Sequence, residues 1–534
     1  MRLLKGNKAN KRLFFTILLL ILSIVIAGCG KSANSLSEAG NTGQSAAGAA
    51  EGKAVKKLTL LYHFKSGSLD PHNDYIVLKA GVVETLVRMD DKLELQPWLA
   101  SKWESVDAST WRFTIREGVT FHNGAMLDAA AVKASLERGI AVNKALDTTL
   151  KIASIKAEGQ ALTITTKEPL PAFPSELVNP YSGIIDVAAE KTRGTEAFNK
   201  APIGTGPFQI KGFTPNMEIN LARYDSYWDG AALLEEITFK FNEDGNVRAL
   251  ALQAKEADLA FQLPAEMVDV IKRDQNLKIA SLAGLRAHFL LYNQQQPALK
   301  DVLVRQALDL LIDRESIAED VMLGNASPAN GPFNANLPFG SQEAVQPLNT
   351  EKAKLLLEQA GYAQGSSGKL EKDGKPLTLE VITYKGRPEL PLIAQLLQSD
   401  AAKIGVSLTI KTVENVDTYL RENNDWDLAT YSNLTAPRGD GGFFLNSAFM
   451  IGGSLNPANI SNDELSTIIG QLNAAGDVAE RAKLTRAAVQ VIKAQALHSY
   501  AVYPNVIVGM NKRVTGWAPG PEEYYLVTNK MDVS

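Results

Sequence analysis

The side chains best suited to recognise a small charged molecule lie in one short segment, residues 431–440. It holds Arg438, whose guanidinium is planar and permanently charged and can donate two parallel hydrogen bonds to a carboxylate. Two other roles are open for Arg438. It could pair with Asp440, two residues further along, or it could be a solvated loop residue. The segment therefore predicts either a carboxylate-binding loop or a structural arginine.

Catalytic chemistry and a built-in metal centre find little support in the residue pattern. The five histidines follow no spacing typical of a zinc site, and the single cysteine lies near the N-terminus. No G-x-S-x-G, P-loop or H-E-x-x-H motif is present. Because triads can assemble from distant positions, an enzyme stays open on these grounds alone. The histidines are His63, His72, His122, His288 and His498.

The N-terminus has the layout of an export signal. Five basic residues precede an apolar run at 13–26, which is the pattern of a signal peptide. As a helix, this run of about fourteen residues would span roughly 21 Å, short of the roughly 30 Å hydrocarbon layer. We therefore favour a cleaved signal peptide over the alternative of a permanent transmembrane anchor.

The apolar run ends in Ile26-Ala27-Gly28-Cys29, which resembles the bacterial lipobox, where cleavage before the cysteine leaves a thiol that carries lipid. Cys29 is the only cysteine, so it cannot form a disulfide within the chain. The following residues, to Ala54, are mostly small and polar and cannot bury enough apolar surface to fold. We predict a signal peptide at 1–28, a lipidated cysteine with a flexible tether at 29–56, and attachment to the outer face of the cell membrane.

Charge and length restrict the function of the remaining chain. Without residues 1–28, which hold five basic and no acidic side chains, the chain has 50 basic and 59 acidic residues and a formal charge of −9. Such a surface does not suit nucleic acid. Roughly 480 residues follow the tether, which is more than one hydrophobic core usually organises. We therefore expect two or more lobes and no nucleic-acid partner.

The residue periodicity indicates a mixed α/β fold. Alternating apolar and polar residues predict strands at 162–166, 218–223 and 237–241. A βαβ unit is predicted from a strand at 377–384, a helix at 390–404 and a strand at 406–412. Asp301 and Asn349 are good N-caps for two further amphipathic helices.

Several motifs occur together from residue 99 onward. The chain reads Leu99-Ala100-Ser101-Lys102-Trp103, then TWRFTIR at 110–116, then GVTFHNG at 118–124. Further motifs follow at 201–208, 224–228, 304–308 and 352–362. Together they closely resemble the family-5 extracellular solute-binding proteins, the peptide and nickel binders of ABC importers. We expect Gly204 and Gly206 in this series to serve backbone geometry and not phosphate binding.

This resemblance implies a two-lobed clamshell of the type II periplasmic-binding-protein class, with mixed sheets and crossing hinge strands near 289–293 and 503–510. Lobe I would comprise residues 57–290 together with the returning segment 510–534, and lobe II residues 291–509. The protein would be a monomer that captures a solute for an ABC permease and ATPase. It would not be an enzyme and would carry no intrinsic cofactor.

The ligand is indicated by the segment that contains Arg438. In peptide-binding relatives this place resembles Ala-Asp-Tyr, whose aspartate pairs with the peptide ammonium, but here Ala436 is followed by Pro437. Nickel-binding relatives resemble Ala-Pro, and Arg438 beside it suits a carboxylate. We predict a nickel or related transition-metal chelate with a carboxylate-bearing chelator, and an oligopeptide as the alternative. The arginine that metallophore binders carry near 179–183 is absent, so the identity of the chelator stays open.

The resemblance also implies which residues line the cleft. Tyr431, Arg438 and Asp440 belong to the ligand segment, and Tyr75 belongs to an early cleft-lining loop. His72, in the same early loop, is either a metal ligand or a hydrogen-bonded turn histidine.

Overall fold

A computed structural model describes residues 55–534 of the chain. The predicted signal peptide, Cys29 and most of the tether lie outside these residues. Between Val55 and Ser534 no helix is both long enough and apolar enough to cross a membrane.

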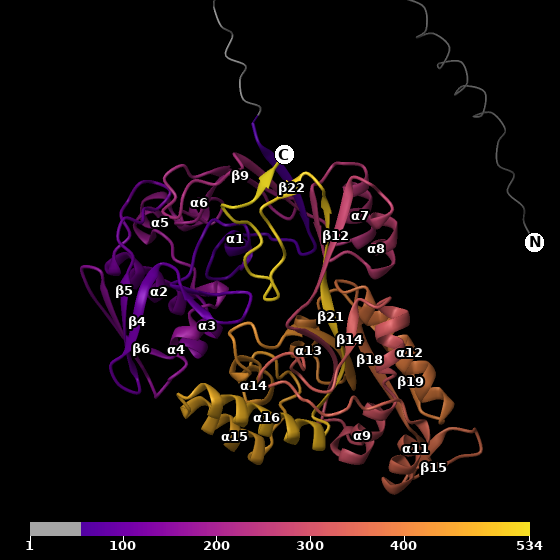
Figure 1. The fold of residues 1–534 in the computed structure, drawn as a ribbon. Helices are drawn as coiled ribbons and strands as arrows, with labels where there is room; N and C mark the ends of the chain where they lie inside the picture. Colours follow the sequence, from indigo (N-terminus) through magenta and orange to yellow (C-terminus); the bar gives the residue numbers. More distant parts are fainter. Residues whose placement is uncertain (1–54) are drawn as a thin grey trace, which may run out of the picture. The chain divides into compact units, whose positions relative to one another are not determined.

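One long strand, β21 (His498–Asn511), connects the two halves of the fold (Figure 1). Its first half pairs with β13 (Arg286–Tyr292) and β14 (Ala326–Pro328). Its second half pairs with β11 (Leu259–Phe261) and β12 (Leu277–Ala283). We call the elements up to β12, with the second half of β21 and the residues after it, lobe I, and the rest lobe II. The boundaries predicted after residues 290 and 509 stay a prediction, because the lobes share this strand.

Lobe I contains a mixed sheet and a separate antiparallel sheet. In the mixed sheet, β1 (Lys57–Tyr62) lies parallel to β10 (Glu236–Phe241) and to β11, and β9 (Glu218–Arg223) and β8 (Phe208–Thr214) extend it antiparallel. The predicted strands at 218–223 and 237–241 are confirmed. The second sheet has the order β4-β5-β7-β6. Its strands are β4 (Ala100–Ser105), β5 (Thr110–Ile115), β6 (Ile152–Glu158) and β7 (Ala161–Thr166).

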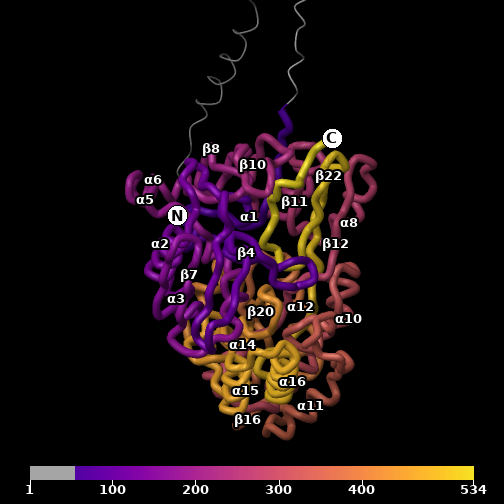
Figure 2. The backbone as a smooth tube through the Cα atoms, turned by 60° about the vertical axis from the view of Figure 1, so that its left-hand side comes forward, coloured from indigo at the N-terminus to yellow at the C-terminus, as the bar shows by residue number. Residues whose placement is uncertain are grey.

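The other elements of lobe I are mostly short. They are α1 (Ile76–Lys79), β2 (Val87–Met89), β3 (Leu95–Pro97), α2 (Ala129–Val142), α3 (Lys144–Leu150), α4 (Phe173–Glu176), the 3₁₀ helix η1 (Pro180–Ser182), α5 (Val187–Arg193), α6 (Thr195–Phe198), α7 (Gly245–Gln253), α8 (Ala265–Lys272), β22 (Val514–Thr515) and β23 (Asp532–Val533). The C-terminal residues return to this lobe (Figure 2). There Trp517 packs edge-to-face on Phe261, at 5.6 Å between ring centroids.

Lobe II contains the predicted βαβ unit. Strand β18 (Thr378–Tyr384) pairs in parallel with β19 (Ser407–Val413), and α12 (Glu389–Lys403) connects them. Strand β20 (Leu428–Leu434) joins β18 to β13. These elements agree with the predicted ranges to within one residue at each end, so the mixed α/β prediction is confirmed.

Helix caps in lobe II follow the sequence prediction as well. The carboxylate of Asp301 accepts a hydrogen bond from the Leu303 amide at the start of α9 (Val302–Leu310). Asn349 caps α11 (Thr350–Gln359) in the same way, through the Lys352 amide. The other elements are the 3₁₀ helix η2 (Ala298–Lys300), α10 (Arg314–Ser316), the π-helix η3 (Ile317–Val321), β15 (Ala363–Gln364), β16 (Leu370–Lys372), β17 (Lys375–Pro376), α13 (Val416–Glu422), α14 (Gly442–Phe449), α15 (Asp463–Ala474) and α16 (Val478–Ala494).

Close backbone packing explains the two glycines of the motif at 201–208. A Cβ on Gly204 would lie 2.2 Å from the Val82 carbonyl oxygen, and one on Gly206 would lie 2.3 Å from that of Gly81. These separations are far below van der Waals contact, so only glycine fits at either position. The expectation that they serve backbone geometry is confirmed.

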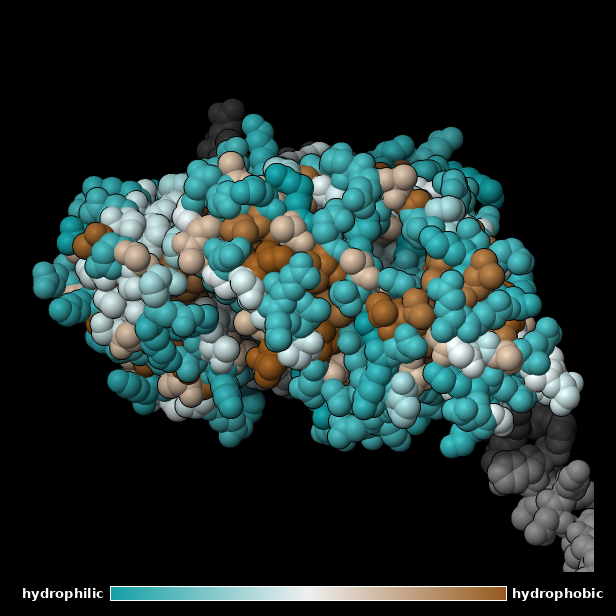
Figure 3. All heavy atoms as spheres, turned by 90° about the horizontal axis from the view of Figure 1, so that it is seen from below, coloured by the Kyte–Doolittle hydropathy of each residue, from teal (hydrophilic) through white to brown (hydrophobic). Residues whose placement is uncertain are grey.

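The apolar side chains form separate buried clusters on the faces of the sheets. In lobe II, Leu290 and Val381 belong to the cluster on one face, and Phe289 and Phe444 belong to the cluster on the other. Seen from the lobe II end, hydrophilic side chains cover most of the surface and apolar patches lie between them (Figure 3). Lobe I has clusters of its own, one with Phe239 and another with Phe113. Separate cores of this kind let the two lobes move as units about the strands they share.

Candidate ligand-binding site

Parallel strands from the two lobes end close to each other. The chain leaves β1 of lobe I at Tyr62 and reaches Phe64, and it leaves β18 of lobe II at Tyr384 and reaches Arg387. The guanidinium carbon of Arg387 lies 5.7 Å from the centroid of the Phe64 ring. Open α/β sheets bind ligands beyond the carboxyl ends of their strands. This place between the lobes is therefore the candidate ligand site.

Arg387 is a buried cation without a hydrogen-bonded anionic partner, although Glu389 and Glu523 lie near enough for its charge to lower their pKa values. It is 3% exposed, and within residues 55–534 no side chain or carbonyl accepts a hydrogen bond from its guanidinium. Arg286, in contrast, is paired with Glu523 at 3.2 Å. A buried guanidinium without an acceptor is costly, whereas a bidentate carboxylate satisfies it. Arg387 is thus a buried cation whose guanidinium is open to an anion from outside the chain.

The nearest acidic group on the same loop is already bound elsewhere. Glu389, at the start of α12, accepts a hydrogen bond from Nε2 of His288 at 2.6 Å. Burial would raise the pKa of Glu389, but this bond and the nearby positive charge of Arg387 hold it at about 2. Burial lowers the pKa of His288, so the ring donates as a neutral imidazole. Glu389 therefore stays ionised and is held in place by His288. It contributes negative charge near Arg387 but does not accept a hydrogen bond from the Arg387 guanidinium.

The lobe I wall of the site is aromatic. A pocket of about 150 Å³ is lined by Tyr62, Phe64, Tyr75 and Tyr181 and by polar groups that include Asp74. The rings of Tyr75 and Tyr181 lie 6.5 Å apart, centroid to centroid. Asp74 accepts hydrogen bonds from the Ser66 hydroxyl and the Ile76 amide, both at 2.8 Å. The structure thus places Tyr75, one of the predicted site residues, on a pocket wall.

The predicted residues of the segment 431–440 all have partners within the chain, although Nε of Arg438 is left without an acceptor among residues 55–534. Tyr431 donates its hydroxyl to Asp417 and packs edge-to-face on Phe289 at 5.7 Å. Asp440 accepts from Nε of Arg481 at 2.8 Å and from the Gly442 amide at the start of α14. These contacts join the segment to lobe II.

Arg438 pairs with Glu176 of α4 and not with Asp440. Its guanidinium carbon also lies 4.3 Å from the centroid of the Phe443 ring, and the side chain is 5% exposed. Burial lowers the pKa of Arg438 to about 10, so it remains charged at neutral pH. The structure therefore makes Arg438 a contact between the lobes.

His72 is buried, and protein groups occupy both of its ring nitrogens. Nδ1 accepts from Nη1 of Arg138 at 2.8 Å, which leaves Nε2–H to donate to the Gly183 carbonyl at 3.0 Å. Burial and the charge of Arg138 lower the pKa of His72 to about 4. This geometry is that of the hydrogen-bonded turn histidine. In the part of the chain that the structure describes, no three His, Cys, Asp or Glu side chains group as metal ligands.

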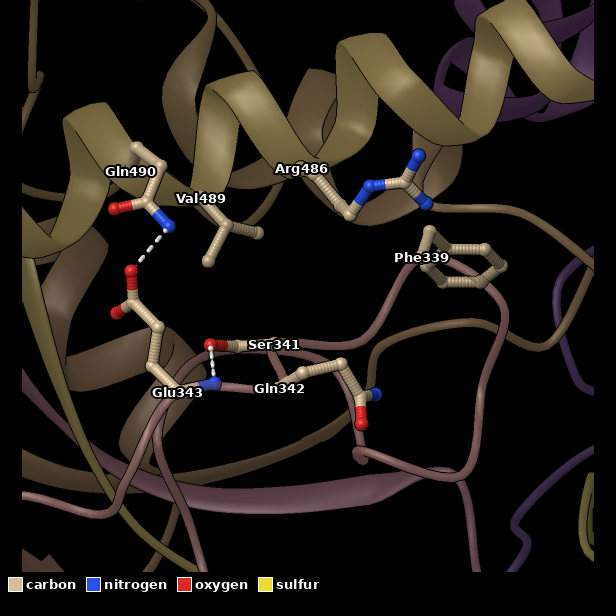
Figure 4. Close-up of a pocket in the computed structure, with 7 residues that line it drawn as sticks. All are labelled: Phe339, Ser341, Gln342, Glu343, Arg486, Val489 and Gln490. Carbon is tan, nitrogen blue, oxygen red and sulfur yellow. Dashed lines mark hydrogen bonds between the residues drawn. The ribbon is translucent and has the colours of Figure 1, made fainter.

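A second pocket, of about 260 Å³, lies within lobe II between α16 and the loop at 339–343 (Figure 4). Phe339 and Val489 supply its apolar lining, and Gln490 donates to Glu343 at 2.9 Å on its rim. No lobe I residue lines it, so lobe closure would not change its walls. It is therefore separate from the candidate site.

Sequence reasoning missed Arg387. The available signal was its place, three residues after the predicted strand at 377–384 and immediately before Pro388. A charged residue just beyond the carboxyl end of a parallel strand is a candidate for ligand binding. The sequence does not reveal which strand ends of the two lobes face each other. That information comes only from the three-dimensional structure.

Comparisons with known proteins agree with this architecture. Residues 94–452 match the model of the bacterial extracellular solute-binding proteins, family 5 Middle. The nickel-binding protein NikA of Staphylococcus aureus is 34% identical over 478 residues, which cover 90% of this chain and 94% of that protein. Its crystal structure in complex with Ni(L-His)2 superposes on this structure with a TM-score of 0.82, and the match covers 90% of this chain and all of that one.

Two further solved structures extend the likeness. A nickel ABC transporter protein from Bacillus halodurans is 43% identical, with a TM-score of 0.72, over 90% of this chain and all of that one. The oligopeptide-binding protein AppA of Bacillus subtilis, in complex with a nonapeptide, is 22% identical with a TM-score of 0.78, over 90% of this chain and all of that one, and shares the fold. Proteins of this family are transport binding proteins that act outside the cell with a permease and an ATPase. The chain belongs to the bacterial extracellular solute-binding proteins of family 5, a two-lobed class of binding protein.

Proposed function

We propose that this protein is the substrate-binding lipoprotein of an ABC importer that captures a nickel chelate and delivers it to the permease. Two relatives at 34% and 43% identity support this assignment, because one is a nickel-binding protein solved with Ni(L-His)2 and the other a nickel ABC transporter protein. The peptide-binding relative AppA shares less of the sequence and supports the fold alone. The cargo would be the metal together with its organic chelator.

The observation that carries the proposal is the guanidinium of Arg387, which donates no hydrogen bond within residues 55–534 and lies beside an aromatic wall. A carboxylate-bearing chelator supplies the anion that Arg387 lacks, and its apolar or aromatic parts suit Phe64 and Tyr75. An ordinary peptide would also bring a terminal ammonium. The segment Ala436-Pro437 lacks the acid that would pair with it, and Asp74 on the pocket wall already accepts two hydrogen bonds from within the chain, so burying that ammonium would carry a cost. The charge pattern therefore favours a carboxylate-bearing chelate.

Capture follows from the position of these groups on different lobes. Arg387 belongs to lobe II, and the wall of Phe64 and Tyr75 belongs to lobe I. A ligand that contacts both binds the closed arrangement better than an open one, and this differential affinity shifts the population toward closure. The protein is proposed to act as a monomer, tethered by lipid on Cys29 at the outer face of the membrane.

Calorimetry on the tag-free mature protein tests the proposal. Wild type would be titrated with nickel alone, nickel with L-histidine, and di- to pentapeptides. We expect tight binding of nickel with histidine and loss of about thirty- to a thousand-fold in Arg387→Ala, roughly 2 to 4 kcal/mol for an unpaired carboxylate. Arg387→Lys should recover part of the loss, because an ammonium cannot reproduce the planar fork.

Arg273 provides the matched control, because it is an exposed arginine on lobe I whose side chain takes no part in the candidate site. Arg273→Ala should bind nickel with histidine as wild type does. Tight metal-free binding of peptides, or chelate binding that is indifferent to Arg387, would contradict the proposal and favour an oligopeptide cargo.

A further inference from the structure

His63 stands apart from the other four histidines. It follows β1 directly, is 2% exposed, and neither of its ring nitrogens has a hydrogen-bond partner within residues 55–534. His72 and His122 use both ring nitrogens, and His288 and His498 each use one. Because buried polar groups are nearly always paired, an imidazole without any partner requires an explanation.

The place of His63 associates it with the candidate site. Its ring centroid lies 4.4 Å from that of Tyr62 and 4.2 Å from that of Phe64, and both of these rings line the lobe I pocket. Phe64 in turn is the ring that faces Arg387. His63 is not itself among the residues that line this pocket, but it lies at the carboxyl end of β1 and packs against two rings that do.

The charge state of His63 at neutral pH follows from its surroundings. Burial, and then the positive charges of Arg387, Arg248, Arg286 and Lys79, lower its pKa well below the ordinary value. The ring is thus a neutral imidazole, which offers one N–H donor and one lone pair. A lone pair of this kind suits a borderline metal ion such as Ni²⁺, and an N–H suits a carboxylate oxygen.

We propose that His63 contacts the bound chelate directly, and that the cargo supplies the partner its ring lacks in the chain alone. This inference rests on the proposed function, since it needs a chelate at Arg387. It assigns a second polar contact, on lobe I, to complement Arg387 on lobe II. One solute held by both would bridge the lobes.

A structural histidine and a ligand-binding one give opposite stability effects. An unpaired buried imidazole destabilises the empty protein, so an apolar replacement of similar size should leave its thermal midpoint equal to or above that of wild type. We expect His63→Leu to show this and to lose at least about tenfold in affinity for nickel with L-histidine. His63→Phe provides a second variant if leucine packs poorly.

His122→Leu is the matched control. His122 makes hydrogen bonds to the backbone of Gly206 and Gly204, so its removal should lower the thermal midpoint and leave the affinity unchanged. The visible absorption spectrum of bound nickel then distinguishes the two contacts. A spectrum altered in His63→Leu indicates a ring nitrogen on the metal, and an unaltered spectrum with lost affinity indicates a hydrogen bond to the chelator.

Two results would overturn the inference and leave the proposed function intact. One is a His63→Leu protein that binds nickel with histidine within about threefold of wild type, while Arg387→Ala does not. The other is a lowered thermal midpoint at unchanged affinity, which marks a structural role. Failure of wild type to bind nickel with histidine would instead overturn the proposed function and this inference with it.

Discussion

Arg438 in the loop after β20 and Glu176 at the end of α4 form an ion pair that joins lobe II to lobe I. The side chains are 5% and 15% exposed, so the pair is largely withdrawn from water. The ring of Phe443 covers the guanidinium from one side. Removing one member of such a pair leaves a buried charge unpaired, which costs far more than removing both. The contact therefore joins the two lobes without any ligand.

This ion pair predicts a specific pattern of binding energies. Arg438→Ala and Glu176→Ala should each weaken binding of nickel with histidine by a similar factor, because each lowers the fraction of protein in the closed, binding-competent form. The double variant should lose no more than either single one, since the two residues act as one contact. Calorimetry on the four proteins gives the coupling, and small-angle scattering should show larger radii of gyration in the empty single variants.

A different pattern of binding energies would show that Arg438 contacts the ligand. If Arg438→Ala loses about 2 to 4 kcal/mol in binding while Glu176→Ala loses almost nothing, the guanidinium grips the chelate as the sequence alone suggested. Ser447→Ala on α14, which changes a side chain outside the ion pair, controls for general effects of altering lobe II.

The predicted lipid anchor at Cys29 lies outside residues 55–534, and substitution of this cysteine tests it. Cys29→Ser should release the protein into the culture medium, because the variant has lost the thiol that would carry lipid and the tether lacks other apolar anchoring residues. Immunoblots of membrane and medium fractions measure the distribution, and Ser35→Ala in the tether is the control. A Cys29→Ser protein that stays in the membrane pellet after high-salt washing would contradict the prediction.

Local signals predicted several of the elements that the structure contains. Asp301 and Asn349 cap their helices because a cap depends on residues two or three positions away. The βαβ unit around α12 was equally visible, since its periods of two and 3.6 are local properties. The family motifs then predicted the two-lobed fold.

Contacts between residues far apart in the sequence could not be predicted from such local signals. Arg438 finds Glu176 at a separation of 262 positions, whereas Asp440, its near neighbour in sequence, pairs with Arg481. His63 matters for the opposite reason, because both of its ring nitrogens lack a partner within residues 55–534. Arg387 matters because it is buried and forms no ion pair among those residues. A missing partner depends on every surrounding element, and no short segment contains that information.

A buried carboxylate connects the family motifs inside lobe I. Glu84 is 1% exposed and accepts hydrogen bonds from the hydroxyls of Tyr227 and Thr205, each at 2.7 Å, and from Nε1 of Trp228 at 3.1 Å. Thr205 and the Tyr227-Trp228 pair belong to two different motifs of the resemblance. The structure thus explains these motifs by one shared acceptor. Burial raises the pKa of Glu84 from 4.5 to about 7, and the three hydrogen bonds oppose the rise.

The raised pKa of Glu84 predicts a pH-dependent stability. Because the folded protein holds this proton more tightly than the unfolded chain does, the contribution is fully present below about pH 4.5 and is lost as the pH rises through 7. Glu84→Gln keeps a neutral side chain of similar shape at every pH. The free energy of unfolding of wild type relative to Glu84→Gln should therefore fall by up to about 3 kcal/mol between pH 4.5 and pH 8. Urea unfolding across this range measures the difference, with the exposed Glu117→Gln as control. A wild-type minus Glu84→Gln difference that is flat or rises with pH would show that the three donors keep Glu84 ionised throughout.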